Sequence, residues 1–431
     1  MKENSFFIPM ENDILTQSFE KLNLKPKESL NIVFVGHVDA GKSTICGQIL
    51  VLLNIVDQRT LDKLSEESKA QGRETWYLSR LFDTNPEEKE KGKTTELGIA
   101  SFVLNNKNFN ILDAPGHKQY IFEMISGANS ADVGILVISA RINEFESGFE
   151  KGGQTREHIL LMKAGSIKSL VVLVNKMDDL SVKWSEERFK EIEKKIGSFV
   201  KLLYKNVVFI PISGYTGENI QTKKQLIWYN GPTFFEYLQN IEVSKQNIKN
   251  FDILITEKNK PNLITGKIEG LSIKKDTILK LIPQNVQLQL NTLYTMDDVE
   301  IEEANTGETI KIKLSKSLED LSIGNRLINI ENTTYLSSNT FTCRITILDC
   351  DSIICKGFKC ILHIGIISAQ CKILEIRDLK NKKLRFVRAG TKVLAKIESE
   401  KSLLLNKETM DKFALRLCEK TLGVGIVRKI L

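Results

Sequence analysis

The first half of the chain alternates continuous apolar runs with segments of helical periodicity. The apolar runs are Ile32–Val35, Phe109–Leu112, Val133–Ile138, Leu170–Val174 and Val207–Ile210. Runs that are apolar at every position are typical of parallel strands buried on both faces. Residues 184–204 place an apolar stripe on one helical face: Phe189, Ile192, Ile196, Phe199, Val200 and Leu203. This pattern predicts a doubly wound α/β domain over residues 29–240, with its ligand at the carboxyl ends of the strands.

The second half of the chain shows short alternating stretches that are punctuated by Thr-Gly and Glu-Gly turns. The stretches are Ile253–Thr256, Ile264–Ile268, Ile278–Ile282, Val286–Leu290 and Ile310–Leu314. They predict an all-β domain over residues 245–331, followed by a second all-β domain over residues 338–431. We expect both to be antiparallel barrels, because closure removes exposed strand edges. Residues 1–28 lack periodicity and are predicted to form a short flexible arm.

A glycine loop follows the first apolar run. Residues 36–43 read Gly-His-Val-Asp-Ala-Gly-Lys-Ser. Gly36 and Gly41 allow a tight turn that aims backbone N–H groups at phosphate oxygens. Lys42 supplies a positive charge to the β- and γ-phosphates, and the Ser43 hydroxyl can hold Mg²⁺. Strand, loop and helix in this order predict a phosphate-binding loop for a nucleoside triphosphate.

The base is indicated by residues 175–178, Asn-Lys-Met-Asp, at the end of the fourth apolar run. The Asp178 carboxylate can accept hydrogens from N1 and the 2-amino group of guanine, whereas adenine would leave it without a partner. Asn175 can bond the purine edge and hold neighbouring loops, and the Lys176 stem can lie over the ring. Ser213 and Gly214 can complete the pocket with backbone N–H groups. The predicted ligand is therefore GTP or GDP.

Two further segments predict a hydrolytic switch. Asp113 directly follows the second apolar run and is the first residue of the segment Asp-Ala-Pro-Gly-His-Lys. We expect Asp113 to reach Mg²⁺ through water, the Gly116 N–H to bond the γ-phosphate, and His117 to orient the attacking water. Thr94, in a charged segment, is the candidate second side-chain ligand to Mg²⁺. Loops that contact both the γ-phosphate and Mg²⁺ can report which nucleotide is bound.

Composition excludes several other classes of protein. No run of 18 apolar residues occurs in the 431-residue chain, and its start does not read as a signal peptide, so we expect a cytoplasmic protein with no membrane contact. Six of seven cysteines lie between Cys343 and Cys418 without a Cys-x-x-Cys pair, which favours core packing over a zinc site.

Residues 338–431 carry 19 Lys and Arg against 9 Asp and Glu. This basic end is either a solvated surface or a contact for RNA or an acidic protein.

The motifs and the domain layout together resemble one branch of the translational GTPases related to elongation factor Tu. Arg73-Glu-Thr-Trp-Tyr-Leu-Ser79, Asp83-Thr-Asn85 and Glu144-Phe-Glu-Ser-Gly-Phe-Glu150 resemble the eukaryotic class II peptide-chain release factors. Gly152-Gly-Gln-Thr-Arg-Glu-His158 and Ser352-Ile-Ile-Cys355 do so as well. The resemblance covers roughly residues 29–431. Leu417-Cys418-Glu419 departs from it, because the family has an Asp-Glu-Gly turn there.

The resemblance implies a set of site residues. Phosphate contacts would come from His37, Val38, Asp39, Ala40, Gly41, Lys42, Ser43, Thr44 and Gly116. Guanine contacts would come from Asn175, Lys176, Asp178, Ser213, Gly214 and Tyr215. Mg²⁺ would be held by Ser43, Thr94 and, through water, Asp113, with His117 as the catalytic residue.

The resemblance also implies a function and partners. The family binds the class I release factor, which reads stop codons, chiefly through the C-terminal domains, and hydrolyses GTP on the ribosome. The ribosome would then position His117 through ribosomal RNA. Poly(A)-binding protein is not an expected partner, because the extension that recruits it is not seen in residues 1–28. The alternatives are a ribosome-rescue GTPase, a tRNA-delivering elongation factor and a scaffold that binds its partner without hydrolysis.

Overall fold

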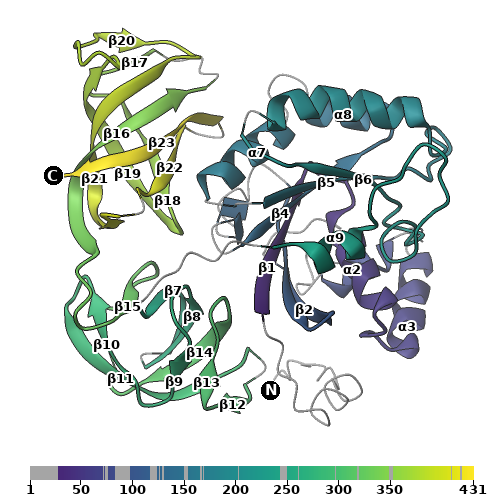
Figure 1. The fold of residues 1–431 in the computed structure, drawn as a ribbon, viewed down its shortest axis with the longest axis horizontal. Helices are drawn as coiled ribbons and strands as arrows, with labels where there is room; N and C mark the ends of the chain where they lie inside the picture. Colours follow the sequence, from purple (N-terminus) through teal and green to yellow (C-terminus); the bar gives the residue numbers. More distant parts are fainter. Residues whose placement is uncertain are drawn as a thin grey trace.

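The structure is a computed structural model that describes most of the chain. It covers residues 28–70, 72, 76–82, 98–116, 124–125, 127–128, 131–149, 154–165, 167, 169–201, 203–242, 250–260, 262–296, 298–317, 320–348, 353–408, 410–417 and 420–431. Figure 1 shows an α/β domain on one side and two β-barrels on the other. No helix in the described part of the chain has the length and apolar character needed to cross a bilayer.

A six-stranded sheet forms the centre of the α/β domain, in the order β2-β3-β1-β4-β5-β6. The strands are β1 (Glu28–Gly36), β2 (Gly98–Leu104), β3 (Lys107–Asp113), β4 (Val133–Ser139), β5 (Ser169–Asn175) and β6 (Val208–Pro211). All neighbours are parallel except the edge pair β2–β3. Every residue of β4 is buried, as expected for a strand covered on both faces. The predicted doubly wound, mostly parallel sheet is confirmed.

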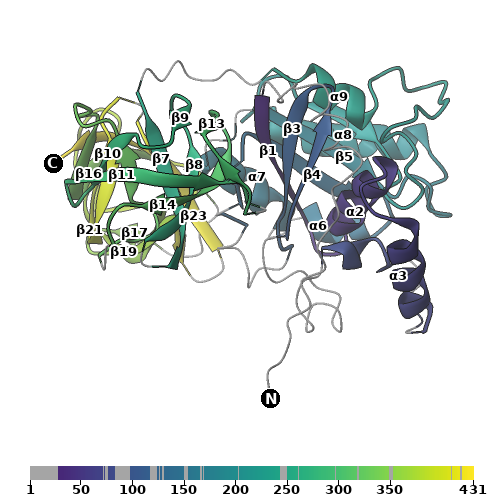
Figure 2. The ribbon, with the colours of Figure 1, turned by 90° about the horizontal axis from the view of Figure 1, so that it is seen from below.

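Helices surround this sheet. They are α2 (Lys42–Leu52), α3 (Gln58–Ala70), α6 (Glu144–Phe149), α7 (Gln154–Ala164), α8 (Glu186–Val200) and α9 (Phe234–Asn240), with the 3₁₀ turn η2 (Ser79–Leu81). The predicted helix over residues 184–204 is α8, and it begins where the Ser185 side chain accepts a hydrogen bond from the Arg188 N–H. In Figures 1 and 2, α3 lies on the side of the domain away from the barrels.

The first barrel closes through pairing of its two end strands. The order β10-β15-β7-β8-β14-β11 becomes a ring because β10 also pairs with β11. The strands are β7 (Asp252–Lys260), β8 (Leu263–Ile268), β10 (Ile278–Ile282), β11 (Val286–Tyr294), β14 (Thr309–Leu314) and β15 (Arg326–Ile328). Short strands accompany them: β9 (Ile273–Lys274), β12 (Glu300–Ile301) and β13 (Glu303–Ala304).

The second barrel is a closed ring in the order β16-β21-β19-β18-β22-β23. Its strands are β16 (Tyr335–Ile347), β18 (Lys359–Ile364), β19 (Ile367–Arg377), β21 (Lys392–Asn406), β22 (Lys412–Leu417) and β23 (Lys420–Ile430), with the short pair β17 (Ile354–Cys355) and β20 (Phe386–Val387). Cys343, Cys360 and Cys371 lie in its core, as predicted for thiols on strands. The prediction of two antiparallel barrels is confirmed.

The second barrel packs directly against the α/β domain. Its strands β22 and β23 contact helix α7, and the side chain of Ala414 joins the core of the α/β domain. The Arg416 guanidinium, only 2% exposed, lies 3.3 Å from the Glu157 carboxylate on α7. The Thr421 hydroxyl donates a hydrogen bond of 2.7 Å to the same carboxylate oxygen. Glu157 therefore ties both strands of this hairpin to α7.

Replacing Glu157 with alanine should destabilise the protein by about 3 kcal/mol, because the buried Arg416 guanidinium loses this carboxylate. Urea unfolding of the full chain measures the change. As a control, Glu186→Ala removes an ion pair with Lys190 that is exposed to solvent, and it should have a far smaller effect. Equal stability of the Glu157 variant and the wild type would contradict the assigned role.

Candidate functional site

The glycine loop joins β1 to α2 in a shape that only glycine allows at two positions. Gly41 has φ 95° and stands immediately before α2, with no side chain capping the helix. A Cβ at Gly41 would lie 2.3 Å from the Asn175 Nδ2, and a Cβ at Gly36 would lie 2.3 Å from the Val137 carbonyl oxygen. The first backbone N–H groups of a helix have no acceptor within the helix, so this end suits an anion.

Lys42 and Gly116 meet at the start of α2. The Lys42 ammonium donates to the carbonyl oxygens of Gly36 and His37, at 3.2 and 3.1 Å. Burial lowers the pKa of Lys42, while the carboxylates of Asp113 and Asp39 act in the opposite direction. A Cβ at Gly116 would lie 2.5 Å from the Lys42 Nζ. The structure thus brings Asp113 and Gly116, from the end of β3, to the lysine of the glycine loop.

Asn175 connects the glycine loop with the loop after β6. Its amide Nδ2 donates to the Ala40 carbonyl oxygen, and its Oδ1 accepts from the Gly214 N–H, both at 2.8 Å. The Ser213 N–H donates to the Glu218 carbonyl oxygen. Both N–H groups therefore donate within the protein in this structure, and the contacts of Ser213 and Gly214 with guanine stay a prediction. Their loop still contributes Tyr215, whose side chain is 45% exposed.

Lys176 belongs to a network of charged groups beside Asp178. Its ammonium lies 2.7 Å from the Glu144 carboxylate, which also accepts from Arg141 at 3.2 Å. Arg141 in turn lies 2.6 Å from Asp179. Hydrogen bonds from Ser181, together with Arg141, lower the pKa of Asp179 to about 2. The sequence motifs did not indicate Arg141 and Glu144 as members of the site; Arg141 lies in the segment after β4, and Glu144 begins α6.

These segments enclose a cavity of about 470 Å³. This volume lies within the ordinary size range of small-molecule sites, and it suits a nucleotide. The predicted residues that line it are Val38, Asp39, Gly41, Lys42, Ser43, Thr44, Gly116, Asn175, Lys176, Asp178 and Tyr215. His37 and Ala40 line a second, smaller cavity instead, and Asp113, Ser213 and Gly214 are buried and line neither cavity. Thr94 and His117 fall outside the described residues.

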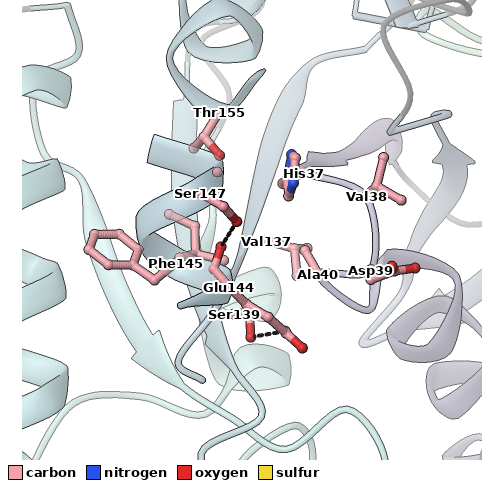
Figure 3. Close-up of a pocket in the computed structure, with 12 residues that line it drawn as sticks. His37, Val38, Asp39, Ala40, Val137, Ser139, Glu144, Phe145, Ser147 and Thr155 are labelled. Atoms are coloured by element: carbon pink, nitrogen blue, oxygen red, sulfur yellow. Dashed lines mark hydrogen bonds between the residues drawn. The ribbon is translucent and has the colours of Figure 1, made fainter. Parts of the chain in front are cut away.

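A smaller cavity of about 180 Å³ lies between the glycine loop and helix α6. Figure 3 shows His37, Val38, Asp39 and Ala40 of the loop on one side, with α6 and Thr155 on the other. A Cβ on Gly148 would already approach the His37 Cβ to 3.2 Å. The glycine loop is therefore supported by α6 on the side of this smaller cavity.

Acidification should destabilise the protein through His158, on α7. Burial, followed by the charges of Lys42, His37 and Arg416, lowers the pKa of His158 to about 3. The pKa of an unfolded histidine is about 6.5, so between these values the unfolded chain binds a proton that the folded chain does not. Stability should therefore fall below pH 6.5, by about 1.4 kcal/mol at pH 5.5.

Urea unfolding at pH 7.5 and 5.5 measures this loss, and His158→Gln should reduce it. An equal loss in both proteins would show that His158 is not responsible.

Two family models match the chain. The model described as Elongation factor Tu GTP binding domain matches residues 27–287, more than half of the sequence. The chain belongs to this family. The model described as Elongation factor Tu C-terminal domain matches residues 335–431, which include the second barrel.

Curated relatives support the predicted resemblance to release factors. Eukaryotic peptide chain release factor GTP-binding subunits from Schizosaccharomyces pombe and Candida albicans are each 39% identical to this protein over 94% of its chain. The matches cover 64% and 60% of those relatives, so the chain spans about three fifths of their length. The resemblance is confirmed.

A solved structure shows the same fold. The GTPase-like domain of Ski7 from S. cerevisiae, bound to GTP, has a TM-score of 0.76 to this structure. The match covers 95% of this chain and 98% of that one, at 17% sequence identity. At this identity the likeness establishes the fold alone.

Proposed function

We propose that this protein is a GTPase of translation termination, the GTP-binding subunit of a release factor. The observation that carries the proposal is the 39% identity to such subunits over 94% of the chain. The cavity supports it, because loops from the ends of β1, β3, β5 and β6 converge there, as in other α/β nucleotide sites.

The residues at the cavity suit a guanine nucleotide. Backbone N–H groups of the glycine loop and the start of α2 would bind the phosphates, with Lys42 supplying positive charge. Asp178 would accept two hydrogens from guanine, and Asn175 would hold the glycine loop in place through Ala40. The same contacts serve GTP and GDP, except that the Gly116 N–H would reach only the γ-phosphate.

The chain also offers suitable ligands for Mg²⁺. Ser43 lines the cavity and the Asp113 carboxylate is fully buried beside Lys42, so hard oxygen donors lie next to the phosphate site. Among the described residues there is no cluster of three or more His, Cys, Asp or Glu side chains suited to a metal. Mg²⁺ in nucleotide sites needs only one or two carboxylates besides phosphates and water. When bound, it would neutralise charge that develops on the phosphates.

Hydrolysis is assigned to His117, the residue after Gly116. Gly116, the residue before it, lies against Lys42, the lysine expected to bind the β- and γ-phosphates. His117 would orient the attacking water once the ribosome positions it. Without that contact, turnover should be slow, at about 10⁻⁴ per second as in unassisted small GTPases.

The proposed partners are the class I release factor, bound through the barrels, and the ribosome in the cytoplasm. Calorimetric titration of the full chain with GTP present tests this choice. We expect binding to the class I release factor and none to aminoacyl-tRNA. A preference for tRNA would indicate an elongation factor. A preference for a release-factor-like rescue protein would indicate a ribosome-rescue GTPase.

A further inference from the structure

One wall of the nucleotide cavity comes from a segment outside the phosphate and base motifs. Trp76 and Ser79, between α3 and β2, line the cavity together with the start of α2 and with Asp178 and Tyr215. The Ser79 hydroxyl donates a hydrogen bond of 2.9 Å to the Trp76 carbonyl oxygen. This bond fixes the turn that carries the indole.

The segment is anchored firmly on helix α2. Leu78 is fully buried, and Arg80 and Phe82 are 5% exposed. A Cβ at Gly47 would lie 2.2 Å from the Leu78 carbonyl oxygen, so α2 and this segment approach as closely as glycine permits. Because α2 begins at the phosphate loop, the position of Trp76 is set relative to the phosphate site.

Trp76 lines the same cavity as Tyr215 and Asp178 of the predicted base site. Burial, and then the charge of Tyr215, raise the pKa of Tyr77, the residue after Trp76. Tyr215 directly follows Gly214, whose N–H bonds to Asn175 of the base motif. Trp76 and Tyr215 therefore lie on the part of the cavity that Asp178 also lines.

We propose that Trp76 packs its indole against the ribose and base end of a bound guanine nucleotide. The inference rests on the proposed function, because it assumes that ligand. Aromatic faces stack on any base and bury apolar area without reading hydrogen-bond patterns. Trp76 thus strengthens binding of GDP and GTP equally, while Asp178 selects guanine.

Affinity gives the first test, by calorimetric titration of the full chain with GDP and with GTP. Trp76→Ala should weaken binding of both nucleotides by a similar factor, about tenfold. Trp76→Phe should keep most of the affinity, because it retains an aromatic face. Circular dichroism confirms that each variant is folded. Unchanged affinity in a folded Trp76→Ala protein would overturn the inference.

Fluorescence gives a second test that a purely structural role would not affect. The chain has three tryptophans, and the other two, Trp184 and Trp228, do not line the cavity. Trp228 packs on Phe189 and Tyr229 instead. GDP should change the emission of the wild type, and the change should disappear in Trp76→Phe but persist in Trp228→Phe.

Two failures are distinguishable. If the wild type binds GDP and the emission change persists in the Trp76→Phe variant, the inference is overturned and the proposed function stands. A folded wild type that binds neither GDP nor GTP would overturn the proposed function itself.

Discussion

Replacing Asp178 with asparagine should shift the preference of the protein from GTP to XTP. The carboxylate is expected to accept hydrogens from guanine N1 and the 2-amino group. Asparagine offers one acceptor and one donor, which suits xanthine, where a carbonyl oxygen replaces the 2-amino group. Sites built to pair a polar group reject the mismatched ligand by about 10⁴-fold, so GTP affinity should fall by roughly 10³-fold or more.

Competition of GTP and XTP for the same labelled nucleotide measures this preference. Asp179→Asn is a matched control, because Asp179 lines the same cavity but pairs with Arg141. That variant should still prefer GTP. Retained GTP selectivity in Asp178→Asn would refute the assignment of the base site.

Replacing His117 with alanine should abolish most ribosome-stimulated GTP hydrolysis while GTP binding stays nearly unchanged. Positioned groups of this kind contribute about 10²- to 10⁴-fold to rate. Gly116, the preceding residue, lies against the Lys42 ammonium. Because His117 is expected to orient water and not to bind the nucleotide, the loss should appear in the rate of hydrolysis and not in the affinity for GTP.

Single-turnover hydrolysis on ribosomes, together with GTP titration, separates these two effects. His117→Gln is the conservative variant, since glutamine orients water in Ras-type enzymes, and it should retain part of the activity. An alanine variant that hydrolyses GTP at the wild-type rate would remove His117 from the catalytic role.

The fold followed largely from local patterns in the sequence. Strands β4 and β5 are apolar at nearly every position because both faces of the sheet are covered, and each predicted apolar run overlaps a strand. The edge strand β2 was missed, because its residues alternate between buried and exposed in an irregular way. An edge strand is covered less completely, so its sequence is less constrained.

The parts that could not be predicted depend on contacts between distant segments. Glu157 and Arg416 are far apart in sequence, and neither pattern nor charge indicates that they pair. The sequence of residues 417–419 departs from the family pattern, in a domain expected to bind the partner. In the structure, the flanking residues Arg416 and Thr421 contact Glu157 of the α/β domain. Described residues on both sides of positions 418 and 419 therefore take part in a contact between domains.

The candidate site likewise contains residues that short motifs indicate and residues that only tertiary packing brings to it. The predicted phosphate and base residues lie in short motifs that spacing and the family resemblance indicate, and the structure brings most of them to one cavity. Trp76 and Ser79 reach the cavity only because Gly47 lets their segment pack on α2. Such a contact depends on tertiary packing, and spacing in the sequence does not encode it.

GTP turnover by the full chain tests the central claim most directly, with ribosomes and the class I release factor present together. We predict turnover far above that of the free protein, and a much smaller increase when either component is omitted. No stimulation above the free protein would contradict the account of this chain as a GTPase of translation termination.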